Sequence, residues 1–98
     1  MDIKVGDGFT GQVLNLYRID DDEYNLYNYA KVISIDEVSR TVEAEVFQVL
    51  ACVIIPLYTE TFVVKMDSNC KSIYDRRGNE FIKDDDNYKY NHLILCDD

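Results

Sequence analysis

Proline and glycine are scarce in this chain, because its 98 residues contain one proline and four glycines. This scarcity excludes an interdomain linker and a low-complexity protein, both of which are rich in these residues. Hydrophobic residues make up 47% of the chain and aromatic residues 12%, a composition too apolar for intrinsic disorder. We therefore expect residues 1–98 to form a single small folded domain.

Positive charge is also scarce: 10 Lys and Arg stand against 19 Asp and Glu, for a net charge of −9. Residues 20–45 contain eight acidic and two basic residues, a net of −6, and residues 67–98 contain eight acidic and five basic residues, a net of −3. Direct binding to nucleic acid is not expected, because it requires cations that displace counterions from phosphates. Acidic membrane surfaces are disfavoured for the same reason. The expected partner is a basic protein surface.

A long apolar run is missing as well. The longest uncharged run, Val46–Thr59, has 14 residues and includes Pro56, so it is too short to span a bilayer. Met1–Val5 is followed at once by glycines and charges, which does not fit a signal peptide. The three cysteines are an odd number at wide spacings, a pattern typical of reduced thiols. We expect a cytoplasmic protein.

Motifs that carry catalysis or bind metal are absent from the sequence. It contains no G-x-S-x-G, P-loop or H-E-x-x-H. His92 is the only histidine, and with Cys96 it supplies too few ligands for a zinc site. Two runs of three aspartates, Asp20–Asp22 and Asp84–Asp86, lack the alternating acids and central glycine of a calcium loop. We expect no enzymatic activity, no metal and no cofactor.

The segment Gly6-Asp7-Gly8-Phe9-Thr10-Gly11 matches G-x-G-x-x-G, the pattern of dinucleotide-binding turns. A complete doubly wound fold needs more βα units than this chain can hold, and the next segment ends in four acids that would repel phosphate. We interpret the segment as a glycine-rich turn that directs the first strand, with Gly11 at a bulge. A nucleotide site at this turn is the alternative.

Short β-branched and aromatic segments, separated by turn residues, predict strands. The first strands are expected at Val13–Ile19, Tyr29–Ile35 and Thr41–Phe47, with a hairpin turn at Asp36–Arg40. In the third strand Val42, Ala44 and Val46 alternate with Thr41, Glu43 and Glu45, which predicts one buried face and one solvated face.

The second half of the chain continues the same pattern. Val49–Ile55 is uncharged and suits a strand buried on both faces and ended by Pro56, although its pattern also fits a buried helix. Further strands are expected at Thr59–Met66 and Leu93–Cys96. Asp67–Asp75 is predicted as a short helical turn. Arg77-Gly78-Asn79 is predicted to turn between strands at Ile73–Asp75 and Glu80–Lys83.

These elements predict an all-β fold with one short helical turn. Six or seven short strands in fewer than 100 residues are typical of a small antiparallel barrel or sandwich, SH3-like or OB-like in size.

Two segments combine aspartates with tyrosines: Asp20–Tyr29 and Asp84–Tyr90. Tyrosine offers a large contact area and a hydroxyl at low entropic cost, and aspartates supply steering and salt bridges to Lys or Arg. We predict that both segments are loops entering strands and that both bind a partner; solvated loops that pack their tyrosines onto the barrel are the alternative. The predicted partner-binding residues are Asp20, Asp21, Asp22, Glu23, Tyr24, Tyr27, Tyr29, Asp84, Asp85, Asp86, Tyr88 and Tyr90.

The leading functional hypothesis is a non-enzymatic acidic binding protein. Its concrete form is an inhibitor or nucleic-acid mimic directed at a nucleic-acid-binding protein, of the anti-defence type encoded by phages or mobile elements. One alternative is a small-ligand or nucleotide-binding domain that uses the Gly6–Gly11 turn. Another is a structural subunit of a homo-oligomeric assembly, and exposed edges of a small sheet favour a dimer. Arg76-Arg77 is interpreted as a solubilising turn, with a head-to-tail contact to a carboxylate loop of a second copy as the alternative.

Overall fold

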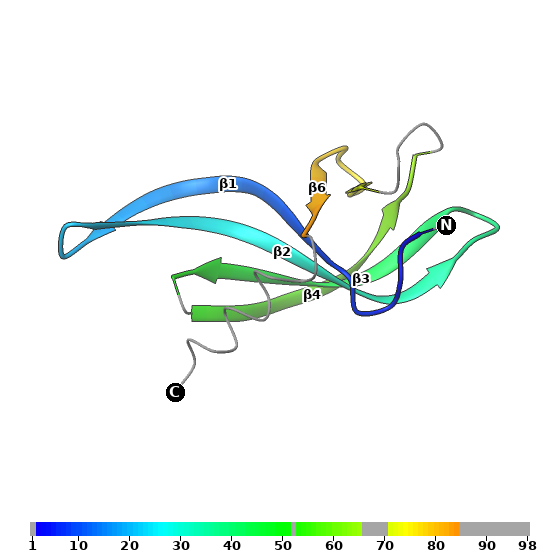
Figure 1. Cartoon of the computed structure of the whole chain (residues 1–98), viewed down its shortest axis with the longest axis horizontal. Coiled ribbons are helices and arrows are strands. Elements are labelled where there is room, and N and C mark those ends of the chain that lie inside the picture. Colours follow the sequence, from blue (N-terminus) through cyan, green and yellow to red (C-terminus); the bar gives the residue numbers. More distant parts are fainter. Residues whose placement is uncertain (1, 52, 66–70, 85–98) are drawn as a thin grey trace.

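The computed structural model describes residues 2–51, 53–65 and 71–84, and six strands lie in these ranges. They are β1 (Gly8–Ile19), β2 (Asp22–Asp36), β3 (Thr41–Leu50), β4 (Val53–Val63), β5 (Ser72–Tyr74) and β6 (Glu80–Lys83). Each strand pairs antiparallel with the next, and β6 pairs with β1 to close a barrel (Figure 1). The predicted all-β antiparallel barrel is confirmed. Its strand order is a simple meander, unlike the Greek-key order of an OB fold.

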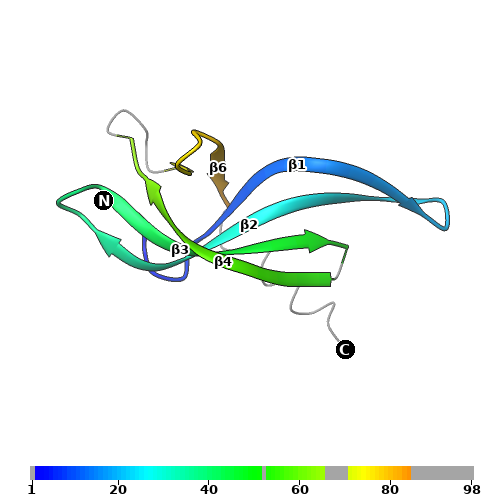
Figure 2. The same cartoon turned by 180° about the vertical axis from the view of Figure 1, so that it is seen from behind.

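The barrel is closed at only one end of the molecule. β5 and β6 have three and four residues, whereas β1 to β4 have 10 to 15 residues and extend well beyond them (Figures 1 and 2). Pairing of β2 with β3 ends at Leu26 and Leu50, and the first residues of β2 pair with β1 alone. A two-stranded ribbon therefore projects from the barrel, and we call residues 13–26 the arm.

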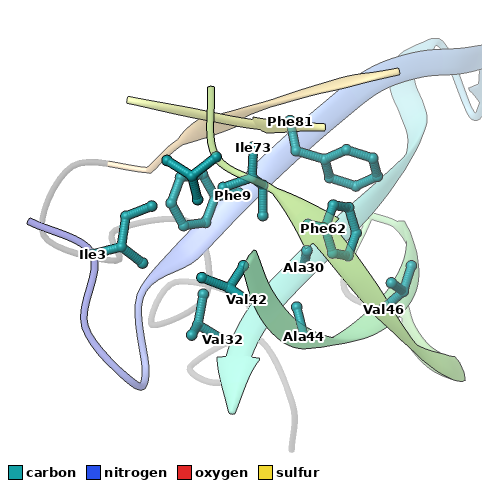
Figure 3. Packing of buried hydrophobic residues seen from close by; sticks show 11 residues of the cluster. Ile3, Phe9, Ala30, Val32, Val42, Ala44, Val46, Phe62, Ile73 and Phe81 are labelled. Carbon is teal, nitrogen blue, oxygen red and sulfur yellow. The ribbon is translucent and has the colours of Figure 1, made fainter. Parts of the chain in front are cut away.

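The hydrophobic core fills the closed end. Phe62 and Phe81 meet edge to face, with ring centroids 5.1 Å apart and an interplanar angle of 77° (Figure 3). The predicted alternation along β3 is confirmed, because Val42, Ala44 and Val46 are buried while Glu43 is exposed. The core residues are Ile3, Phe9, Ala30, Val32, Val42, Ala44, Val46, Phe62, Val64, Ile73 and Phe81.

The glycine-rich segment is a turn followed by a strand, as predicted. Gly6 has a φ of 97°, and its amide donates to the Val32 carbonyl at 2.8 Å, while Val32 donates back to Asp7 at 2.9 Å. Gly11 lies at a bulge in β1, where an added Cβ would come within 3.0 Å of the Phe81 ring. β1 begins directly in this motif, so the helix that a dinucleotide site requires does not follow it.

The expectation of one strand at Val49–Ile55, buried on both faces, is wrong. β3 ends at Leu50, Ala51 takes a left-handed φ of 54°, and β4 begins at Val53. The segment is therefore a hairpin, and its second strand is exposed, with Val53 at 57%. Apolar composition alone does not distinguish a strand covered on both faces from one that leaves the barrel.

Pro56 lies inside β4 and does not end it, which corrects a second expectation. It pairs with Phe47 next to an irregularity, because Val46 pairs with Tyr58 and Leu57 is the extra residue. No described strand pairs with the other side of β4 at this point. An edge position beside a bulge tolerates a residue without an N–H group.

Both predicted hairpin turns are present. The residues between β2 and β3 form a turn in which Asp36 Oδ1 accepts from the amides of Val38 and Ser39 at 3.0 and 3.2 Å. Between β5 and β6, Gly78 has a φ of 86°, and Asp75 Oδ1 accepts from Asn79 N at 2.8 Å.

Other expectations concern the C-terminal third of the chain. The predicted helical turn at Asp67–Asp75 lies partly outside the described residues, and its second half, Ser72–Tyr74, is strand β5. The expected strand at Leu93–Cys96 lies outside them altogether. Within the described ranges no helix is long and apolar enough to cross a membrane, and no three His, Cys, Asp or Glu residues gather to hold a metal ion.

Replacing Phe62 with Ala should destabilise the barrel strongly. Phe62 is fully buried against Phe81, so its loss leaves a cavity and should lower the free energy of unfolding by about 3–5 kcal/mol in urea denaturation. Val38, 98% exposed in the β2–β3 turn, is the control, and Val38→Ala should change stability by less than about 0.5 kcal/mol. Equal effects of the two changes would contradict this account of the core.

Candidate protein interface on the arm

Three acids form the tip of the arm. Ile19 pairs with Asp22, which leaves Asp20 and Asp21 as a two-residue loop, and both have positive φ, at 52° and 69°. This is the geometry of a type I′ turn, whose twist matches that of the flanking strands. Asp tolerates the left-handed region better than most residues. The sequence thus places exposed carboxylates at the far end of the ribbon.

Glu23, the next acid, is already paired. It lies opposite Arg18 on β1, and Arg18 Nη2 is 2.7 Å from Glu23 Oε1. Both side chains are more than half exposed, so the pair contributes at most about 1 kcal/mol to stability. Its main effect is to reduce the net charge beside the tip, leaving the negative potential concentrated on residues 20–22.

An apolar groove runs along the face of the sheet that continues the barrel interior. Cross-strand partners share a face, and residues two apart on a strand point to the same side. Ala30 and Val46 pair inside the barrel, so Leu26 and Leu50, an even number of residues away, lie on the same face outside it. We call this the inner face. The groove has a volume of about 230 Å³ and is lined by Tyr17, Leu26, Gln48, Leu50, Val53 and Ile55.

Tyr24 joins this groove to the tip. It pairs with Tyr17 across the arm, so both rings lie on the inner face, between the groove and the acidic turn. Tyr24 is partly exposed and Tyr17 is exposed. The inner face of the arm therefore carries carboxylates at its end and tyrosines behind them.

Tyr27 and Tyr29 lie on the opposite, outer face. Tyr29 is fully buried beside Val49, and its hydroxyl donates to Asp84 Oδ2 at 3.3 Å. A Cβ at Gly8 would overlap that hydroxyl, so glycine leaves the room that the ring needs. Burial, and secondarily the negative charge of Asp84, raise the pKa of Tyr27 above its ordinary value of 10.0.

Among the described residues, the two Asp–Tyr segments meet at the buried cluster around Tyr29 and not at the tip of the arm. Asp84 contacts Tyr29 in a packed cluster, whereas Asp22 is seven residues up the same strand, roughly 23 Å away at 3.3 Å per residue. Tyr29 is a core residue and offers no surface. The predicted residues Asp85, Asp86, Tyr88 and Tyr90 lie outside the described residues.

Sequence reasoning missed the apolar side chains that the arm and the β3–β4 hairpin leave in water. Val13, Leu14, Leu16 and Ile19 are each about half exposed on β1. The sequence did contain a sign of these exposed side chains, because the run from Val13 to Ile19 carries apolar residues without strict alternation. Such a run is typical of a strand buried on both sides, yet the described residues cover neither side here.

A hollow lies at the mouth of the barrel, between the arm and the β5–β6 turn. Its volume is about 450 Å³, and its lining includes Leu14, Tyr58, Arg76 and Arg77. Arg76 Nε is 3.6 Å from Glu60 Oε1 across it. Asn28 Oδ1 is buried in this wall and has no hydrogen-bond partner among the described residues.

The raised pKa of Tyr27 predicts an alkaline loss of stability. The folded protein holds the phenolic proton more tightly than the unfolded chain, so the contribution is complete below pH 10 and is lost as the pH rises through the folded pKa. In urea unfolding between about pH 9 and 12, Tyr27→Phe should flatten this decline. Asp84→Asn should flatten it less, because burial remains. A decline unchanged in Tyr27→Phe would rule out this assignment.

An Asn-Gly turn should stabilise the arm while removing two charges. Asn and Gly are the preferred residues of a type I′ turn, and glycine adopts positive φ without steric cost. We expect Asp20→Asn with Asp21→Gly to raise the free energy of unfolding by up to about 1 kcal/mol. Thermal unfolding followed by circular dichroism measures this change, and a lower melting temperature would contradict the assigned turn geometry.

The acidic tip and the inner face behind it thus combine exposed carboxylates with an apolar groove and two tyrosines. Together they can make ion pairs and bury aromatic rings. A comparison of the chain with protein-family models, curated proteins and solved structures found no match.

Proposed function

We propose that this chain is a non-enzymatic binding protein of the cytoplasm whose arm docks on a basic protein surface. The observation that carries the proposal is the projecting ribbon, which places the exposed carboxylates of residues 20–22 at one end of a molecule 48 Å long. A projecting tip of one charge sign can enter a concave surface of the opposite sign. The strongly acidic composition favours the same class of partner.

The tip supplies attraction and orientation. Charged groups at an interface accelerate association and fix the docking geometry more than they add affinity. The two-residue turn holds Asp20 and Asp21 in a defined backbone geometry, so little backbone freedom remains to be lost on binding.

The inner face supplies the apolar and aromatic area that a bound partner would bury. Stable interfaces have an apolar, aromatic centre and a charged rim, and Tyr17, Tyr24 and Leu26 stand directly behind the acids in that order. Tyrosine buries a large area while its hydroxyl keeps a hydrogen-bond partner. The groove of about 230 Å³ beside them can accept one or two side chains of the partner.

In its concrete form, the proposal is an inhibitor of a nucleic-acid-binding protein, of the type that phages or mobile elements direct against host defence. The basic surface that such a protein presents to phosphates is the surface that the carboxylates of the tip would occupy. The described acids favour a local contact, because Asp22 and Asp36 stand at opposite ends of β2, roughly 45 Å apart. A discrete acidic tip mimics a few phosphates and not a continuous backbone.

Capture on the immobilised chain tests this function. A basic, nucleic-acid-binding protein should be retained from host lysate at low salt, released at high salt and displaced by double-stranded DNA. Removal of two tip charges by Asp20→Asn with Asp21→Gly should weaken binding of the purified partner at least about tenfold.

The matched control removes charge at the other end of the molecule. Asp36→Asn with Glu37→Gln keeps the Asp36 acceptor of the β2–β3 turn and should leave affinity within about twofold of the wild type. Equal loss in both variants would show that total charge and not the tip drives binding. Binding that does not change with salt, or that DNA does not displace, would refute the inhibitor proposal.

A further inference from the structure

The outer edge of β1 is open along the arm. β6 pairs with β1 only at Phe9 and Thr10, and no described residue pairs with the same edge from Val13 to Ile19. The Leu16 amide donates to the side chain of its neighbour Asn15 at 2.9 Å, a local bond that a paired strand would replace. Every residue from 12 to 19 is exposed. This edge therefore presents backbone groups that another strand can pair with.

The open edge lacks the usual protection. Soluble proteins guard free edges with lysines, prolines and bulges, and β4 carries both Pro56 and a bulge. The bulges of β1 lie before Asn15, so the stretch from Asn15 to Ile19 is regular. Its one charge, on Arg18, is paired with Glu23 on the same ribbon.

The neighbouring strand fixes where an added strand would lead. β6 runs antiparallel to β1 along this edge and begins just after the β5–β6 turn. A strand added antiparallel to the arm lies in line with β6 and runs in the same direction. Its C-terminal end therefore points at the β5–β6 turn, which carries Arg76 and Arg77 beside the hollow at the barrel mouth. Glu60 and Asp75 line the same hollow, and Arg76 is 3.6 Å from Glu60, so Arg77 is the main cation that the turn offers to a second copy.

A second β1 fits this position by charge. Its C-terminal end leads into Asp20, Asp21 and Asp22, the most concentrated acids of the arm, and these would meet the two arginines. We infer that two copies of this chain pair through their β1 edges in a two-fold dimer, with the acidic tip of each copy against Arg76 and Arg77 of the other. The contact is isologous, so each ion-pair cluster forms twice.

The dimer is a four-stranded sheet in the order β2–β1–β1–β2. It satisfies the open backbone groups of both edges and brings the half-exposed Leu16 and Tyr17 of one copy beside those of the other. The two ion-pair clusters offset the repulsion between chains of net charge −9. The dimer also engages the tip, so a basic partner would compete with the second copy for residues 20–22.

Sedimentation velocity across a concentration series up to about 200 μM tests the dimer. Leu16→Lys adds a positive charge to each of the paired edges and should weaken dimerisation at least about tenfold. Val38→Lys, the same change of charge at an exposed site away from the edge, should leave the dimer intact. Circular dichroism checks that both variants keep the fold.

A charge swap tests the tip–turn contact separately. Arg77→Glu alone and Asp22→Lys alone should each raise the dimer dissociation constant about three- to tenfold, and the double variant should restore it. A wild type that stays monomeric at the highest concentration overturns the dimer, as does a Leu16→Lys variant that dimerises like the wild type. A double variant no tighter than either single variant overturns the contact between tip and turn. These experiments use the chain alone, so their outcome is independent of the proposed basic partner. Binding of that partner is measured separately.

Discussion

Barrel closure depends on a small number of residue pairs between neighbouring strands. Between β1 and β6 it consists of Phe9 with Lys83 and Thr10 with Ile82, and between β4 and β5 of a single pair. These contacts hold the β5–β6 hairpin over the core, where the rings of Phe62 and Phe81 meet. Because β5 and β6 are so short, they cover only one end of the four longer strands. The groove, the arm and the open edge all follow from this difference in strand length, since the inner face continues past the point where the barrel stops.

Much of this barrel could be predicted from local pattern. The hairpin at Asp36–Arg40 was predictable because strict alternation on its second strand fixes which side chains are buried. Strand boundaries were less accessible wherever a bulge breaks the period of two. β1 has two register shifts against β2, and β4 has one beside Pro56. A bulge adds a residue without a pattern of its own, so sequence reasoning placed strand ends at the points where the alternation fails.

For the candidate site too, the residue types could be predicted from the sequence but their arrangement could not. The sequence identified the concentration of acids and tyrosines, but it placed residues 20–29 in a loop entering a strand. Only Asp20 and Asp21 form the turn, and β2 begins at Asp22. A ribbon with both faces in solvent needs no apolar alternation, so its polar strand resembled a loop. The roles of the tyrosines were also hidden, because Tyr24 and Tyr29 are five residues apart, an odd number that places them on opposite faces of the strand.

The two bulges of β1 separate the regular end of the arm from the closed barrel. Each bulge interrupts the ladder between the closed barrel and the regular end of the arm, and local opening in proteins tends to follow such breaks. The arm beyond Asn15 is therefore joined to the packed phenylalanine core through an interrupted ladder. The side chains of residues 12–19 are exposed, so most substitutions there should leave the packing of the core unchanged. The fold thus separates a barrel that must stay packed from a short arm whose exposed side chains can change with what the arm binds.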